Sequence, residues 1–229
     1  MWVTLSLIAL IIAAICWIIG DALIVGFTRP NPETHGEFIE RMGDDAYAFQ
    51  LEASDKRLLV GALIADYSVP LLLLGLYAHG YLVRDSIIGL VGVVMMGIGI
   101  SLSPLAHAGF YPIGLIGQRA WAEFQEGRDM DYSIRHARSL MRFLKLAWIP
   151  AVGLTFIGGL VFAVPVVLGH TAFPWWAVLF LPIVWMIPLS FLPKIPYPGK
   201  PLLDGAQFNL ALLGWAIAFL VLSQSYAPL

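Results

Sequence analysis

The first apolar run of the chain, residues 2–27, reads WVTLSLIALIIAAICWIIGDALIVGF, and this stretch decides the class of fold. A helix of about 20 apolar residues crosses the hydrocarbon core of a bilayer. The run is longer than that, has no basic region before it, and exceeds the roughly 7–15 apolar residues of a cleavable signal. It therefore predicts a retained transmembrane helix, and this helix carries one carboxylate, that of Asp21.

The rest of the chain has the same character. Hydrophobic residues make up 59% of the 229 positions and charged residues only 12%, which is about half the charged share of a soluble domain. The mean hydropathy is +0.82. Five further apolar runs follow the first, at 58–82, 87–116, 143–168, 174–192 and 202–224. The sequence predicts an all-α polytopic membrane protein: one transmembrane domain over 1–229, a bundle of six spans with short interfacial or cytoplasmic helices in the loops.

Lysine and arginine are distributed very unevenly among the predicted loops. Twelve of the thirteen follow the first, third and fifth spans, and only Arg84 lies on the other side. Cytoplasmic loops are enriched in these residues, so we expect the three long loops in the cytoplasm and both termini outside it. The net charge of −2 indicates no nucleic-acid partner, which leaves membrane lipids and a small or amphiphilic ligand as the expected partners.

The two longest predicted loops contain helix signals. Residues 34–37 match a capping box, and Phe38, Met42, Ala46 and Phe49 then share one helical face, which predicts a short helix lying on the membrane. In the second loop, Gly127 is a predicted stop for a helix that continues the third span. Asp129 or Asp131 is a predicted cap for a long helix that runs into the fourth span.

Three ionisable side chains lie inside predicted spans. A charged group at the centre of a membrane helix costs about 2.5–3.5 kcal/mol on insertion scales, so each marks a functional hypothesis. Counted at 1.5 Å per residue from the basic ends of their spans, Asp21, Asp66 and His107 lie about 9, 14 and 18 Å deep. We therefore expect them in a polar cavity open to the cytoplasm and lined by the first, second, third and sixth spans.

Neighbouring polar residues complete the predicted site. The ligand- or proton-binding candidates are Asp21, Asp66, His107, Asn209, Gln207, Tyr67, Ser103 and Tyr111. Pro104 and Pro112 flank His107 in the third span, so this helix is expected to kink or unwind there and to free backbone carbonyls.

Three chemistries fit this set of residues. The cluster is a proton relay or binding site in a carrier, or it holds a divalent metal for hydrolysis of a lipid, or it only joins helices by hydrogen bonds. The spacing contains no HExxH, no cysteine pair and no second histidine at the same depth, so no metal and no cofactor is predicted. Binding or proton-linked transport is the leading hypothesis, a structural or partner-binding role is the main alternative, and hydrolysis is the third.

Four segments carry a resemblance that spans nearly the whole chain. They are GD at 20–21, KRL at 56–58 with GAL at 61–63, SPLAHAGF at 103–110, and PYPGKP at 196–201 with GAQFN at 205–209. With these segments the chain resembles an uncharacterised bacterial family of six-helix integral membrane proteins. The resemblance implies six spans in a bacterial inner membrane and carries no catalytic residue across. The zinc-binding histidines of alkaline ceramidase-like membrane hydrolases have no counterpart here.

Overall fold

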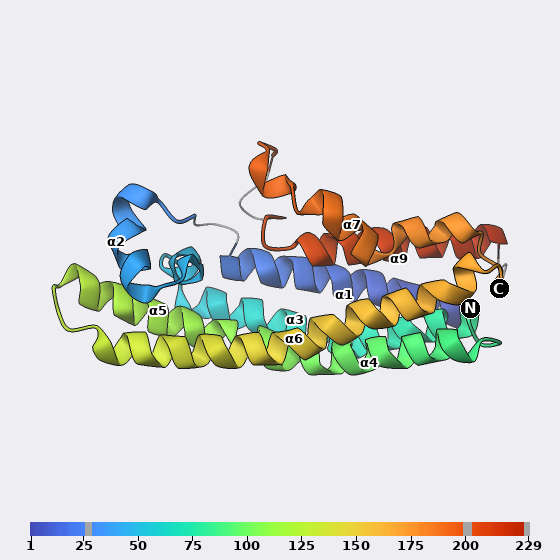
Figure 1. The fold of residues 1–229 in the computed structure, drawn as a ribbon, viewed down its shortest axis with the longest axis horizontal. Helices are drawn as coiled ribbons and strands as arrows, with labels where there is room; N and C mark the ends of the chain where they lie inside the picture. The colour runs from blue at the N-terminus through green and yellow to red at the C-terminus, as the bar shows by residue number, and fades with distance from the viewer. Residues whose placement is uncertain (26–28, 199–202, 227–229) are drawn as a thin grey trace.

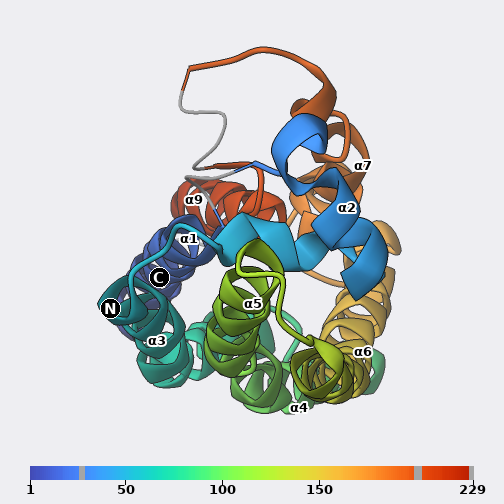
Figure 2. The same ribbon diagram turned by 90° about the vertical axis from the view of Figure 1, so that its left-hand side faces the viewer.

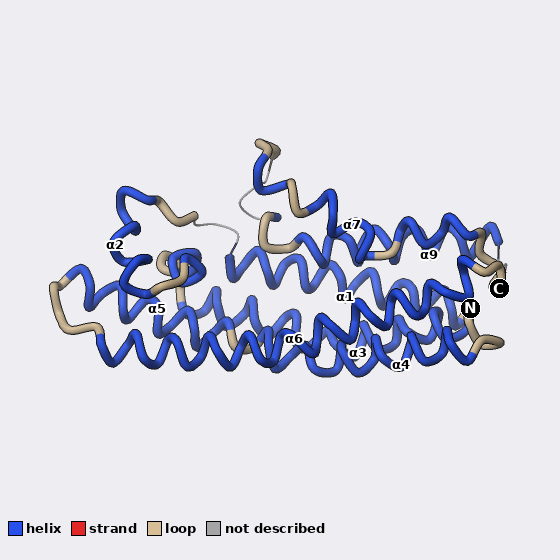
Figure 3. Tube along the Cα trace, in the orientation of Figure 1, coloured by secondary structure: helices blue, strands red, loops and turns tan. Residues whose placement is uncertain are grey.

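The computed structural model describes residues 1–25, 29–198 and 203–226. Over these residues the chain forms helices and loops and no strand (Figure 3). The α-helices are α1 (Trp2–Val25), α2 (Pro32–Met42), α3 (Asp55–Leu82), α4 (Ile87–His107), α5 (Phe110–Gln125), α6 (Asp131–Val167), α7 (Pro182–Leu189) and α9 (Gln207–Tyr226). The 3₁₀ helices are η1 (Asp45–Gln50), η2 (Trp175–Phe180) and η3 (Leu192–Lys194). The predicted all-α class is confirmed.

Among the described residues, five helical stretches are long and apolar enough to cross a membrane: α1, α3, α4 with α5, α6 and α9. Helix α1 shows how such a helix meets its surroundings. Leu5, Ile8, Ile12, Ile15 and Ile19 recur at helical spacing, and each is more than 40% exposed. A stripe of large exposed aliphatic side chains along a helix suits contact with lipid tails, so the protein is embedded in a membrane.

The fifth predicted span, 174–192, is not one helix. The chain forms η2 over Trp175–Phe180, then the eight-residue helix α7, then η3. Pro182 stands at the start of α7 and Pro188 inside it, and a proline has no N–H to continue a helical ladder. In Figure 1 this broken segment runs back along the bundle, so that α9 ends beside the start of α1.

The other predicted boundaries shift by a few residues. Helix α1 ends at Val25, and residues 26–27 of the predicted span lie outside the described residues, as does residue 202 at the start of the last span. The predicted span 143–168 is the membrane part of α6, which extends back to Asp131. At 1.5 Å per residue the 37 residues of α6 reach about 55 Å, roughly 25 Å more than the bilayer core.

The predicted span 87–116 divides at residues 108–109 into α4 and α5. Pro104 cannot donate to the carbonyl of Ile100, and the Ser103 hydroxyl donates to that oxygen instead, at 2.5 Å. Pro112 removes a second donor just beyond the break. The predicted irregularity beside His107 is therefore confirmed.

Close approach at glycine pairs sets which helices are neighbours. A Cβ on Gly92 would lie 2.7 Å from the Gly158 carbonyl oxygen, which brings α4 against α6. A Cβ on Gly20 would lie 2.8 Å from the Gly61 oxygen, which brings α1 against α3. Viewed along the bundle, α6, α4, α3, α1 and α9 follow one another around an arc (Figure 2).

One end of the bundle, here called the basic end, holds α2, η1, α5 and the first half of α6 (Figure 1). Arg29, Arg57 and Arg138 lie at this end, whereas Arg84 lies at the opposite end between α3 and α4. Helix α5 ends just before Gly127, whose φ of +63° suits a glycine stop, as predicted.

The predicted membrane-surface helix differs from expectation in two ways. The cap of α2 is Asn31, whose side chain accepts from the Glu33 N–H, and not Thr34. Its apolar face is covered by protein, because Phe38 and Met42 pack with Tyr47, Ile113, Ala137 and Met141 in one core. Residues of η1, α5 and α6 supply this cover.

Candidate functional site

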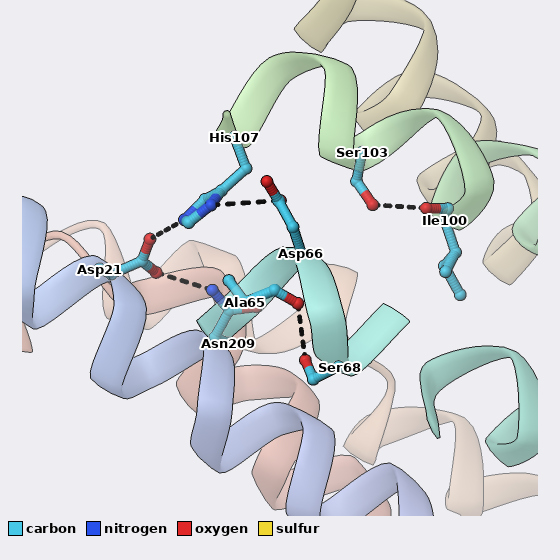
Figure 4. Close-up of polar contacts among 8 residues, drawn as sticks. All are labelled: Asp21, Ala65, Asp66, Ser68, Ile100, Ser103, His107 and Asn209. Carbon is cyan, nitrogen blue, oxygen red and sulfur yellow. Dashed lines mark hydrogen bonds and ion pairs between the residues drawn. The ribbon is translucent and has the colours of Figure 1, made fainter. Parts of the chain in front are cut away.

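Asp21, Asp66, His107 and Asn209 form one cluster, named here the carboxylate–histidine cluster, in which His107 and Asn209 are buried and the two carboxylates are 12–16% exposed (Figure 4). His107 Nε2 lies 3.6 Å from Asp21 Oδ1, and His107 Nδ1 lies 3.5 Å from Asp66 Oδ1. Asn209 Nδ2 donates to Asp21 Oδ2 at 2.7 Å. His107 is only 4% exposed, and four helices, α1, α3, α4 and α9, each contribute one of these side chains.

The local sequence explains how the cluster forms. Gly20 and Gly61 let the backbones of α1 and α3 touch, which places Asp21 and Asp66 within reach of one imidazole. A Cβ on Gly20 would also lie 3.5 Å from His107 Cε1, at van der Waals contact, so the close approach of α1 and α3 occurs beside the ring. His107 is the last residue of α4, directly before the break.

The proton inventory of the cluster follows from its geometry. Each ring nitrogen faces one carboxylate oxygen, and either group of such a pair is able to carry a proton. One proton on each of the two pairs would give the three side chains a combined charge of −1. A third proton would make them neutral.

Trp17 is a second ring at the cluster, beside that of His107, and sequence reasoning did not select it. Its ring centroid lies 4.8 Å from that of His107, it is 9% exposed, and its indole Nε1 has no hydrogen-bond partner. Both ring nitrogens of His107 and Asp66 Oδ1 also lack a hydrogen bond of normal length. Buried polar atoms without partners are rare, and several together suit a site that takes a polar guest. Trp17 stands four residues before Asp21, a helical spacing that could have revealed it.

The other predicted site residues lie elsewhere. Tyr67 is 76% exposed and points away from the bundle, because adjacent residues of a helix face about 100° apart. The Tyr111 hydroxyl donates to Asp55 Oδ1 at 2.7 Å, at the start of α3. Ser103 satisfies the Ile100 carbonyl beside Pro104. Gln207 opens α9, two residues before Asn209.

A second buried histidine, His79, occupies the opposite half of the bundle. Trp215 Nε1 donates to His79 Nε2 at 2.7 Å, and His79 Nδ1 lies 3.0 Å from the Gly75 oxygen. An indole N–H can only donate, so Nε2 must accept, and the ring is neutral with its proton on Nδ1. Both nitrogens are satisfied, and the ring packs against Phe162 and Phe219.

The cluster does not have the geometry of a metal site. The two carboxylates face opposite edges of one imidazole, and the ring lone pairs diverge, so the three side chains cannot converge on one ion. Throughout the described ranges, no three His, Cys, Asp or Glu side chains are grouped so that they could hold a metal.

A cavity of about 480 Å³ lies at the basic end, where α1 ends and the chain approaches α9. Val25, Arg29, Phe49 and Asp204 are among its lining residues. The sequence predicted a cavity lined by the spans that carry the cluster, but the lining described here comes from the end of α1, from η1 and from the approach to α9. Trp17 and the Gly20–Gly61 contact pack the bundle tightly around His107 instead.

The chain matches no protein-family model, and neither the curated proteins nor the solved structures contain a match to it. The cluster and its surroundings are therefore the features of the molecule that bear on its function.

Proposed function

We propose that this membrane protein binds a small or amphiphilic molecule, or transports it with proton exchange, through the carboxylate–histidine cluster. The observation that carries the proposal is the burial of His107 between two carboxylates. In this proposal Asp66 and His107 exchange the proton, Asp21 orients the ring, and Asn209 with Gln207 contacts the ligand. The basic end faces the cytoplasm of a bacterial inner membrane, in accord with the distribution of lysine and arginine.

The energetics favour a functional role over a purely structural one. Ionisable groups in a membrane interior are expensive, and pairing relieves only part of the desolvation penalty. Interhelical hydrogen bonds contribute about 0.6 kcal/mol on average, so apolar packing could join the same helices at lower cost. Both ring nitrogens of His107 lack a short hydrogen bond, so the cluster contributes little to holding the helices together.

A structural role is the second candidate, and one observation favours it. The Asn209–Asp21 hydrogen bond and the two histidine contacts connect four helices, α1, α3, α4 and α9. If this were the function of the cluster, no change of its protonation would be needed.

Infrared difference spectroscopy of the protein in lipid bilayers, between pH 5 and pH 9, tests the proposal. We expect a reversible carbonyl band of a protonated carboxyl group that is lost in Asp66→Asn. The control Asp85→Asn, at a carboxylate that is 88% exposed at the opposite end, should keep this band. A spectrum in which no such band responds to Asp21→Asn or Asp66→Asn would leave the structural role.

A further inference from the structure

We infer that the molecule taken by the cluster is a small organic cation, which enters from the basic end through the cavity beside Val25. This inference rests on the proposed function and adds to it the chemical class of the ligand and its route.

The position of the cavity supports the route. Val25 lines the cavity and lies one helical turn beyond Asp21 in α1. Gly205 also lines the cavity and lies four residues before Asn209. Two lining residues of the cavity thus lie four residues along the chain from the two partners of the Asp21–Asn209 hydrogen bond. A Cβ on Gly205 would overlap Val25 Cγ2, so these two residues form the barrier between the cavity and the cluster.

The size of the cavity limits what can enter. About 480 Å³ lies within the range of roughly 300–1,000 Å³ that is typical of small-molecule sites. An organic molecule of modest size fits this volume, whereas a bare proton or metal ion would not need it.

The charges along the route are mainly negative. Asp45 and Asp204 line the cavity, and Asp21 and Asp66 stand at the cluster. Among the described lining residues the positive group is Arg29, which forms an ion pair with Asp204. The Tyr197 hydroxyl also donates to the Asp204 carboxylate. Arg57 of α3 faces the end of α1 and donates to the Leu23 carbonyl at 2.6 Å. With His107 included, carboxylates remain in excess along the route, and this excess favours a cation over an anion.

Aromatic rings line the same route. Phe49 borders the cavity, while Trp17 and Phe110 lie with ring centroids 4.8 and 5.8 Å from that of His107. Carboxylates combined with aromatic faces recognise organic ammonium groups, because the ring quadrupole attracts a cation that is partly stripped of water.

The proton balance of the exchange is simple. With three protons the cluster is neutral, and with two protons its charge is −1. A monovalent cation that arrives as one proton leaves therefore keeps the buried site neutral before and after binding, which avoids an uncompensated charge in the membrane.

The test uses the purified full-length protein in lipid nanodiscs and three probes of similar size: benzylammonium, benzyl alcohol and benzoate. We expect benzylammonium to bind with release of about one proton, measured with a pH dye in weak buffer. Its affinity should fall about tenfold for each pH unit of acidification once the cluster holds its third proton. Benzyl alcohol and benzoate should bind at least tenfold more weakly.

Variants locate the binding. Val25→Trp fills the cavity and should abolish benzylammonium binding, whereas Ile12→Trp, on the lipid-facing side of α1, should not. Asp45→Asn is a milder change at an exposed position that does not threaten folding, and it should weaken binding several-fold.

The outcomes separate this inference from the proposed function. A protein that shows the Asp66-dependent carboxyl band but binds benzoate in preference, or binds none of the probes, exchanges protons and does not take an organic cation, which overturns the inference alone. Absence of the band overturns the proposed function. Benzylammonium binding that survives both Val25→Trp and Asp45→Asn would overturn the route.

Discussion

Among the described membrane-spanning helices, α3 and α4 each bury one histidine, in opposite halves of the bundle, and the two rings are held in opposite ways. His79 is 3% exposed and has both nitrogens in hydrogen bonds of 2.7 and 3.0 Å, inside a box of aromatic rings. His107 is 4% exposed and faces two carboxylates at 3.5 and 3.6 Å, with no hydrogen bond of normal length. The two rings are therefore equally buried, but only the ring nitrogens of His79 have hydrogen-bond partners at normal length.

The difference teaches how to separate a structural polar group from a functional one in a membrane. A structural group has every donor and acceptor paired, so its charge state has no reason to change. A group that must exchange protons needs partners that accept either state, and that arrangement sacrifices stability. The predictions below test this distinction.

The largest expected effect is at His79. His79→Leu leaves the buried Trp215 N–H without an acceptor and disturbs the packing against Phe162 and Phe219, so it should lower the free energy of unfolding by about 2–4 kcal/mol. The loss should be the same from pH 5 to pH 8, measured by thermal unfolding in detergent. His136→Leu, at an exposed histidine, is the control. A loss of stability below 1 kcal/mol would contradict the structural role of His79.

The next effect is at Gly20, which supports the cluster from outside it. A Cβ there would press on the Gly61 carbonyl oxygen and on Ala65 and would push α1 away from α3, so Gly20→Ala should cost about 1–3 kcal/mol and weaken benzylammonium binding. Gly153→Ala, at a glycine with open space around its Cα, should be neutral or stabilising by up to about 1 kcal/mol. Equal stabilities for the two variants would contradict the close approach of α1 and α3.

Substitution within the cluster should behave differently from His79. Asp66→Asn keeps the shape of the side chain and removes one buried negative charge, so stability should stay the same or rise by about 1 kcal/mol, while proton exchange is lost. Thermal unfolding and the infrared carboxyl band measure the two effects. A clear fall in the stability of Asp66→Asn would show that the carboxylate of Asp66 has a structural role.

The sequence predicts Ser103 as a ligand-binding residue, and a substitution there tests that prediction. Ser103→Ala removes the donor to the Ile100 carbonyl and should cost only about 0.6 kcal/mol, with benzylammonium affinity unchanged. Loss of binding in a variant of normal stability would instead assign Ser103 to the ligand.

The smallest effect concerns Tyr47, a buried ring at the basic end. Its effect on stability is confined to alkaline pH and is absent at neutral pH. Burial, reinforced by Asp44, raises the pKa of Tyr47 from 10 to about 12. Between pH 10 and pH 12 the unfolded chain loses this proton while the folded chain keeps it, so stability should fall across that window. Tyr47→Phe should reduce that fall, and an unchanged slope would mean that the ring is accessible to water when folded.

Much of the fold could be predicted from apolar runs, and its errors have physical causes. The depth argument brings Asp21, Asp66 and His107 together, and the structure places them so. Depth alone says nothing about rotation around a helix, which is why Tyr67 was included although it faces outward. An apolar run does not reveal its path either, so 174–192 was predicted as a span despite its prolines.

The part of the site that sequence could not provide is the contact geometry. Nothing in the sequence indicates that both ring nitrogens of His107 face carboxylates, while His79 finds an indole and a carbonyl. Those partners come from helices far apart in the chain, and their pairing depends on the glycine contacts that set helix neighbours.

The most direct test of the contrast between the two rings is ¹⁵N NMR of histidine-labelled protein in lipid bilayers from pH 5 to pH 9, with His79→Leu and His107→Gln used to assign the signals. The account predicts that His79 keeps one neutral Nδ1–H tautomer throughout, while the His107 signals change reversibly with pH as the cluster gains or loses a proton. Two rings that both stay constant, or that both titrate, would contradict it.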